Sequence, residues 1–203
     1  MRTRLRAITM DLARLLIPVV PLVAVGGPGA FAQGNEGVTP HTQPPLTSEK
    51  HSNFGIPKPL QVEHEELHSA LAQLTKAGGR TGESARRLAE VLDPHFQKEN
   101  EYALPPLGLL VPLSEGKFNC DMMAVLNLTD KLQAEMPAML SEHKDIAAAL
   151  AQLKEAAMSE NNSAGRQFAE HLAGHAQMEE QVTYPTSLLI GLYVKGKSDQ
   201  CPR

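Results

Sequence analysis

Residues 95–99 read HFQKE, and residues 175–179, eighty positions later, read HAQME. Each segment carries a His that is followed four residues later by a Glu. On an α-helix this spacing leaves the two side chains about 40° apart around the axis and about 6 Å apart along it. Both side chains of a segment can then point into the same protein interior. The two segments therefore predict two helices that each present an imidazole and a carboxylate to a common core.

The similarity between the two halves of the chain extends beyond these segments. Glu63-His64 and the ALAQL at 70–74 recur 79 positions later as Glu142-His143 and the ALAQL at 149–153. The chain therefore contains two helical hairpins, with one residue inserted between their matched parts. Stacking two such hairpins gives an all-α, antiparallel up-down four-helix bundle with a pseudo-two-fold internal repeat.

Turn signals and prolines divide the second part of the chain into four helices. Gly78-Gly79 ends the first, and Pro137 should bend or break the third. Pro94 stands directly before His95, and it either kinks the second helix or begins a new one. Trp is absent and aromatic residues are scarce, which favours helices over sheets. We expect helices over about 59–77, 83–103, 118–158 and 163–192.

The first 57 residues are predicted to lie outside the bundle. Residues 1–32 combine a basic start, an apolar stretch and Ala30-Phe31-Ala32, which is typical of a cleaved signal peptide. An uncleaved anchor is the alternative, although the apolar stretch is short for a bilayer span. Residues 33–57 are rich in Pro, Gly and polar side chains and predict a flexible linker. The bundle is expected over 58–195 and a tail over 196–203, in a protein that is exported to the periplasm or secreted and does not contact the membrane after cleavage.

Charge and cysteine content narrow the function classes. Removing residues 1–32, with four Arg and one Asp, changes the net charge from −4 to −7. A mildly acidic exported protein is a poor candidate for nucleic-acid binding. Cys120 and Cys201 predict a disulfide in an oxidising compartment, with two unpaired thiols as the alternative. The bridge is favoured because the start of the third helix and the end of the fourth lie at the same end of an antiparallel bundle.

Each predicted helix carries one His at a matched place, and two helices add a carboxylate. Buried imidazoles need hydrogen-bond partners, and buried carboxylates need a compensating charge. Their convergence between the helices predicts a metal site with two-fold symmetry, since imidazole suits iron, zinc or copper and a carboxylate can bridge two ions. The alternative is a set of ordinary core His and solvated Glu residues. The six predicted ligands are His64, His95, Glu99, His143, His175 and Glu179.

These motifs, together with Tyr184-Pro185, resemble the hemerythrin family, specifically its bacterial HHE cation-binding branch, over about residues 59–192. The resemblance implies two non-haem iron ions, bridged by two carboxylates and an oxo or hydroxo group; zinc is the alternative metal. Carried over by position, it makes Glu99 and Glu179 the bridges. It also pairs the imidazoles by hairpin, with His64 and His95 on one iron and His143 and His175 on the other.

The sequence departs from the oxygen carriers of that family in two respects. Position 147, one turn after His143, is Ala, and the additional His is His68, one turn after His64. We expect His68 to be a fifth imidazole ligand, with a surface position as the alternative. The second bridging carboxylate, Glu179, follows its His by four residues, where carriers have Asp after five. Further candidates for lining the pocket or contacting the ligands are His171, Glu142 and Tyr184, and the repeat partner of His171 is Val91, which predicts a core-facing His.

The resemblance implies a protein that reversibly binds dioxygen, or a related small diatomic or peroxide ligand, for storage, delivery or sensing. A di-iron enzyme that acts on peroxide, nitric oxide or ferrous iron is the alternative, which a carboxylate or Tyr beside the metals would favour. Structural metal binding, perhaps of zinc, is a third class. The sequence predicts no nucleophile constellation and names no protein partner.

Overall fold

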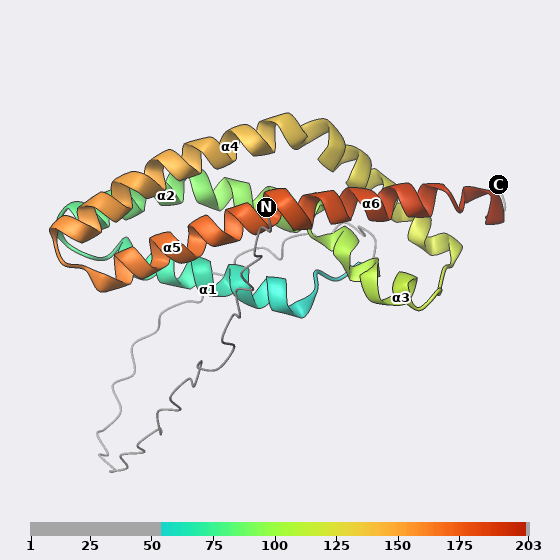
Figure 1. Cartoon of the computed structure of the whole chain (residues 1–203), viewed down its shortest axis with the longest axis horizontal. Helices are drawn as coiled ribbons and strands as arrows, with labels where there is room; N and C mark the ends of the chain where they lie inside the picture. Colours follow the sequence, from blue (N-terminus) through green and yellow to red (C-terminus); the bar gives the residue numbers. More distant parts are fainter. Residues whose placement is uncertain (1–53, 202–203) are drawn as a thin grey trace, which may run out of the picture. The chain divides into compact units, whose positions relative to one another are not determined.

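The computed structural model describes residues 54–201. The regular elements in that range are all helices, joined by short turns, and it contains no strand (Figure 1). The predicted signal peptide and linker residues 33–53 lie outside the described residues. Four long helical segments form a bundle. They are α1 (Lys58–Leu74), α2 (Gly79–Lys98), α4 (Val125–Ser159) and the pair α5 (Ser163–Met178) and α6 (Tyr184–Lys195). The shorter elements are η1 (Glu99–Ala103), η2 (Pro105–Leu109), α3 (Leu110–Ser114), η3 (Cys120–Ala124), η4 (Glu179–Thr183) and η5 (Ser198–Gln200).

Prolines bend this bundle without interrupting its long helices. Pro94 lies inside α2, so the alternative that it begins a new helix is wrong. Pro137 lies inside α4, which continues past it and arches alongside α5 and α6 (Figure 1). A proline lacks the N–H for one intrahelical hydrogen bond, and its ring displaces the preceding turn, so a curved helix is the expected response.

The start of α2 is capped by a side chain from the end of α4. The Glu160 carboxylate accepts hydrogen bonds from the Arg80 N–H at 2.7 Å and from the Thr81 N–H at 3.0 Å. Gly79 makes this approach possible, since it has φ +71° and a Cβ there would lie 2.4 Å from Glu160 Oε1. The helix therefore begins at Gly79, four residues earlier than the sequence pattern predicted. At α5 the cap is the Asn162 side chain, which accepts a hydrogen bond from the Gly165 N–H.

Two regions of apolar side chains enclose a polar layer. Toward the α1–α2 turn, the core holds residues such as Leu71, Leu92 and Leu150. On the other side of the layer lie Tyr102, Leu132, Met139 and Tyr184, with further residues of η2, η3 and α6 beyond them. Each buried Leu contributes about 2 kcal/mol relative to exposure, so these regions hold the polar layer in place. Leu92 precedes His95 by one turn, and Tyr102 follows Glu99 by three residues, which puts the predicted ligands in that layer.

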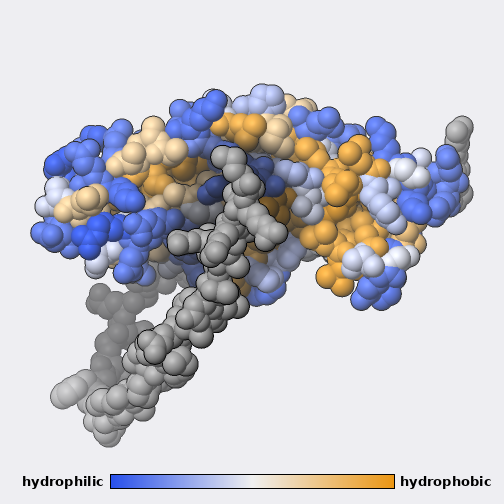
Figure 2. Space-filling view, viewed as in Figure 1, coloured by the Kyte–Doolittle hydropathy of each residue, from blue (hydrophilic) through white to orange (hydrophobic). Residues whose placement is uncertain are grey.

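At the α3 and α6 end, the apolar character reaches the surface. Figure 2 shows hydrophobic surface over these two elements, where Val111, Leu189 and Leu192 are each about two-thirds exposed, at 66%, 65% and 66%. None of the described helices is long and apolar enough to cross a membrane.

Both ends of the described chain are fastened to the bundle. Phe54 and Ile56 pack against the apolar residues of η2 and η3, although the sequence predicted a flexible linker up to residue 57. The Gly55 carbonyl approaches Gly108 so closely that a Cβ there would lie 2.3 Å from the oxygen. At the other end, a disulfide joins Cys120 to Cys201 with a Cα–Cα distance of 5.5 Å. The chain end beyond α6 is therefore tied to the start of the third helical segment.

Candidate metal centre

Six buried polar side chains from all four helical segments meet in the polar layer. They include Glu99, which is fully buried, and His95, which is 1% exposed. The other four are between 3% and 5% exposed. The full set is His64, His95, Glu99, His143, His175 and Glu179, the six ligands that the sequence predicted.

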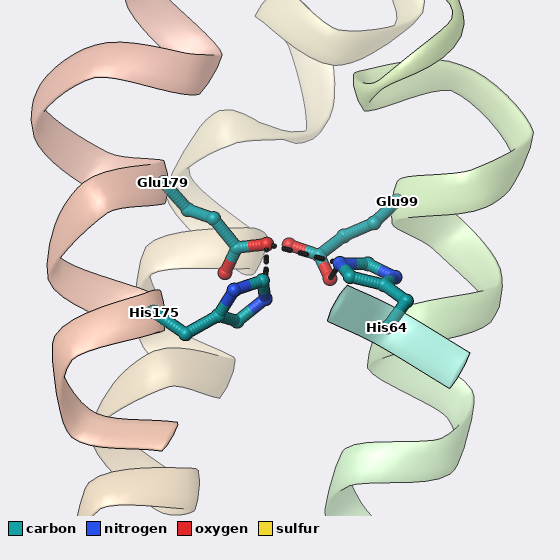
Figure 3. A group of neighbouring side chains, drawn as sticks. All are labelled: His64, Glu99, His175 and Glu179. Carbon is teal, nitrogen blue, oxygen red and sulfur yellow. Dashed lines mark ion pairs between the residues drawn. The ribbon is translucent and has the colours of Figure 1, made fainter. Parts of the chain in front are cut away.

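Their ligand atoms form two groups of four that share both carboxylates. The first group is His64, His175, Glu99 and Glu179, which Figure 3 shows with the two Glu side chains pointing toward each other from opposite helices. The second group is His95, His143, Glu99 and Glu179. Within each group one nitrogen or oxygen from every residue lies within 4.8 Å of all the others. Each group therefore offers two imidazole nitrogens and two carboxylate oxygens to one ion.

Each carboxylate directs one oxygen toward each group. Glu99 Oε2 lies 3.7 Å from His64 Nε2, while Glu99 Oε1 lies 3.3 Å from His95 Nε2. Glu179 Oε1 lies 2.9 Å from His175 Nε2, while Glu179 Oε2 lies 3.5 Å from His143 Nε2. This is the arrangement that two bridging carboxylates need between a pair of ions.

The pairing of the imidazoles differs from the one expected by position. The expectation gave each ion the two His residues of one hairpin, but the groups pair His64 with His175 and His95 with His143. The ring centroids of these pairs are 5.0 Å and 4.6 Å apart. Such a pairing is possible because α1 lies against α5, and α2 against α4, as well as against the helix that neighbours each in sequence. Each candidate ion position therefore takes one His from each of the two matched segments.

A π-helical turn begins at each of the two shared carboxylates. The Leu104 N–H donates to the Glu99 carbonyl at 2.9 Å, and the Tyr184 N–H donates to the Glu179 carbonyl, both across five residues. In each case the next residue is a proline, Pro105 or Pro185, which has no N–H to continue an α-helical ladder. Such turns are rare and are frequent at functional sites. The sequence signal was the proline six residues after each Glu, and its consequence was not predicted.

Carboxylates outside the cluster contact the outward nitrogens of three imidazoles. His95 Nδ1 lies 2.9 Å from Glu142 Oε2, and His143 Nδ1 lies 2.8 Å from Glu180 Oε1. His175 Nδ1 lies 3.3 Å from Glu63 Oε1. A proton on Nδ1 leaves the Nε2 lone pair free to face the cluster, as in metal-bound imidazoles. Glu142 was a predicted contact of this kind, whereas Glu63 and Glu180 were not singled out.

Two further predicted histidines lie outside both groups. The His68 side chain is 61% exposed, and its Nε2 lies 3.6 Å from Asp93 Oδ1. The His171 side chain is 51% exposed and lies 3.4 Å from Glu63 Oε1, so it does not face the core as its repeat partner suggested. Both lie one turn from a predicted ligand, but around the helix they fall to one side of the buried residues, such as Leu67 and Leu71 in α1 and Leu172 in α5. The structure thus places His68 on the surface, the alternative position, and not among the ligands.

Tyr184 reaches the second group only. Its hydroxyl donates to Glu99 Oε1, and it lies 3.3 Å from His143 Nε2 and 3.4 Å from His95 Nε2. The side chain is 1% exposed, and its ring stacks on that of His143. The predicted candidate is therefore in direct contact with three of the four ligand atoms of that group.

The first group is left with polar atoms that have no partner. Within the described residues, Glu99 Oε2, Glu179 Oε1 and the Nε2 atoms of His64 and His175 make no hydrogen bond. Burying such atoms unpaired costs free energy, and a cation bound by all four would offset that cost. Two imidazole nitrogens and two carboxylate oxygens are a donor set that iron or zinc accepts. The residues present therefore fit one cation in each group.

Without a cation, protons compensate the buried charges. Burial and the charge of Glu179 raise the pKa of Glu99. Burial also opposes ionisation of Glu179, but the imidazoles of His143, His175 and His64, whose Nε2 atoms lie within 3.5 Å of its oxygens, hold the pKa of that carboxyl well below its usual value. Burial would lower the pKa of His175, but the Glu179 carboxylate outweighs it and raises that pKa to about 9. The cluster thus holds positive charge between its carboxylates even when it holds no metal.

The surface opens next to the first group. A hollow of about 840 Å³ is lined by residues that include His64 of α1, Phe96 of α2 and Asn100 of η1. His64 stacks on Phe96 with their ring centroids 4.4 Å apart. The buried imidazole of His64 is thus the part of the cluster that borders this hollow.

The chain has no significant match to a family model, to a curated protein or to a solved structure. The metal-site assignment therefore rests on the positions, burial and chemistry of the side chains themselves.

Proposed function

We propose that this chain is a hemerythrin-like antiparallel four-helix bundle that holds two non-haem iron ions and reversibly binds dioxygen or a related small ligand. The observation that carries the proposal is the pair of four-atom groups that share Glu99 and Glu179. Two ions in these positions would be bridged by both carboxylates, and the imidazoles would complete their surroundings. Iron would supply the electrons and the coordination position that dioxygen or nitric oxide requires.

The repeat in the sequence supports the two-fold character of this centre. The matched residues His64 and His143 contribute to different ion positions, as do His95 and His175. An up-down bundle built from two equivalent hairpins would place such residues around one approximate axis. The same symmetry relates Glu63 to Glu142, which contact the outward nitrogens of His175 and His95.

The protein's own residues define how a small ligand would be held. Glu63, Glu142 and Glu180 orient the imidazoles, and the apolar regions on both sides of the polar layer exclude water from the ions. The imidazole-rich donor set leaves the ions less electron-rich than a carboxylate-rich oxidase site does. These features favour reversible binding over turnover.

We further propose that residues 1–32 are a signal peptide and that the folded protein works in the periplasm or outside the cell. The Cys120–Cys201 disulfide supports this, because structural disulfides persist mainly in oxidising compartments. A protein partner for sensing or delivery would have to come from another chain.

Metal analysis and absorption spectroscopy on the exported protein test the proposal. We expect two iron ions per chain and an absorption change on aeration of the ferrous protein that reverses on deoxygenation. His64→Ala should lose iron, whereas the exposed neighbours His68→Ala and His171→Ala should keep it. A protein that is purified with zinc, or whose absorption spectrum does not change on aeration, would contradict the proposal.

An enzymatic role for the same centre is the second candidate. It is favoured by the Tyr184 hydroxyl and the Glu142 carboxylate, which both lie beside the second group. In that case the protein would consume peroxide or nitric oxide, or oxidise ferrous iron, in steady state. Turnover of added peroxide that disappears in Glu99→Ala would favour this candidate over reversible binding.

A further inference from the structure

The two ion positions differ in one buried side chain that the internal repeat does not duplicate. Tyr184 follows Glu179 by five residues, and the residue five after Glu99 is Leu104. The ligands themselves are matched between the two halves, but the hydroxyl of Tyr184 has no counterpart. Only the group of His95 and His143 therefore has a phenol among its ligand atoms.

The Tyr184 hydroxyl lies where a further ligand to an ion held by His95 and His143 would lie. Atoms bound to one metal at about 2.1 Å and at right angles to each other lie about 3 Å apart. The Tyr184 oxygen lies 3.3 Å and 3.4 Å from the Nε2 atoms of His143 and His95, and it donates a hydrogen bond to Glu99 Oε1. It is therefore about as far from the other donors as neighbouring ligands are from one another.

The packing around Tyr184 leaves its ring little freedom to move. The ring is 1% exposed and stacks on His143 with centroids 5.7 Å apart. Leu132 and Met139 belong to the same buried cluster. Because the ring is fixed in this way, an ion at the second group would meet the phenolic oxygen.

Hollows reach both groups, since His143 of the second group lines one of about 520 Å³, but within residues 54–201 the first group has no such fifth donor. Its four ligand atoms make no hydrogen bond within the described residues, whereas three of the second group's atoms contact Tyr184. His64, a member of this group, forms part of the wall of the hollow of about 840 Å³. An external ligand that enters there would meet the ion of the first group.

We propose that Tyr184 is a phenolate ligand of the ion held by His95 and His143, so that the external ligand binds the ion held by His64 and His175. The inference rests on the proposed dinuclear iron centre and deepens it. On coordination the phenol loses its proton to solvent and forms one metal–oxygen bond, with no change in oxidation state. The centre would then have one closed ion and one open ion.

The test compares the ferric, full-length protein with Tyr184→Phe and with Tyr102→Phe as the matched control. Tyr102 is another buried tyrosine, and its hydroxyl contacts Met139 and none of the ligands. We expect the wild type and Tyr102→Phe to show a visible phenolate-to-iron charge-transfer band and phenolate ring modes in resonance Raman spectra. Tyr184→Phe should lose both. With azide as the probe, the wild type should bind one anion per chain and Tyr184→Phe should bind two.

The outcomes separate this inference from the proposed function. Two irons per chain and a reversible oxygen response without phenolate Raman modes in the wild type would overturn the role of Tyr184 and leave the dinuclear centre standing. A wild type with a single iron and no phenolate modes would also overturn the inference, since the Tyr184 hydroxyl would then occupy the position of an ion at the group of His95 and His143. A wild type that binds no iron would overturn both. Because the Raman measurement is made on the wild type, the inference is tested even if Tyr184→Phe does not fold.

Discussion

Removing the metal should destabilise the bundle by an amount that follows from its unpaired buried atoms. Four ligand atoms of the first group make no hydrogen bond among the described residues. An uncompensated atom of this kind costs about 1–3 kcal/mol, and in the metal-free chain the ion pair of His175 with Glu179 removes part of that cost. One bound ion at a thousandfold excess over its Kd adds about 4 kcal/mol of stability. For a domain of this size, 1 kcal/mol shifts Tm by about 2–4 °C, so each ion should raise Tm by about 8–16 °C.

Thermal unfolding followed by circular dichroism measures this shift. The chelated protein is compared with the same protein after anaerobic addition of ferrous iron, and with zinc in a parallel sample. His64→Ala should lose most of the increase, since it removes a ligand. His68→Ala and His171→Ala are matched controls, because they remove exposed imidazoles one turn away, and they should keep the full increase. Equal Tm values for chelated and loaded wild type would refute the reasoning, as would loss of the shift in a control.

Three further predictions concern the groups around the centre and the fold that holds it. Glu142→Ala removes the carboxylate that contacts His95 Nδ1 and should weaken metal binding about tenfold to a hundredfold in chelator competition, whereas Glu101→Ala, which loses an exposed ion pair with Lys131, should not. Hydrogen bonds from Thr81 and Arg80 hold the pKa of Glu160 below its usual value, so its contribution to stability is present above pH 4.5 and is lost as the pH falls through the lowered pKa. Urea titrations should therefore show Glu160→Gln less stable than wild type at pH 7, with a smaller difference at pH 3; an unchanged difference contradicts this cap. Gly79→Ala, at φ +71° and against Glu160, should lower stability by about 1–2 kcal/mol, while Gly174→Ala, a helical position with no atom within 4 Å of the added Cβ, should raise it by up to about 1 kcal/mol.

Helical periodicity was sufficient to predict which side chains meet. A His and a Glu four residues apart share a helix face whatever the rest of the fold does. Buried imidazoles and carboxylates need hydrogen-bond partners and a compensating charge, and one shared site in the interior can provide both for all four helices. The same reasoning was insufficient for His68, because the rotation of about 40° from His64 turns it away from the side of the helix that carries the buried Leu67 and Leu71. One turn after His64, Leu67 and Leu71 already occupy the interior, and His68 lies beside Asp93 on the outside.

The features that the sequence did not predict depend on tertiary neighbours. The pairing of His64 with His175 uses the contact between α1 and α5, although α1 also contacts α2, and the order of the helices does not specify which neighbour supplies the second imidazole. The π-helical turns at Glu99 and Glu179 need a proline that blocks the α-helical ladder and a packed interior that accepts the wider turn. The early start of α2 needs Glu160, which is 80 residues from Arg80 in the sequence.

The two candidate ion positions have the same types of ligand, but the residues around them differ between the matched parts of the sequence. Tyr184 and Glu180 lie where the first half has Leu104 and Asn100. Tyr184 contacts the ligand atoms of the second group, and Glu180 contacts the outward nitrogen of His143 in that group. Asn100 instead lines the hollow beside His64, whose Nδ1 makes no hydrogen bond within the described residues. Both differences therefore add contacts around the candidate ion position of His95 and His143 and leave that of His64 and His175 with fewer, which is why we propose that an external ligand binds at the latter.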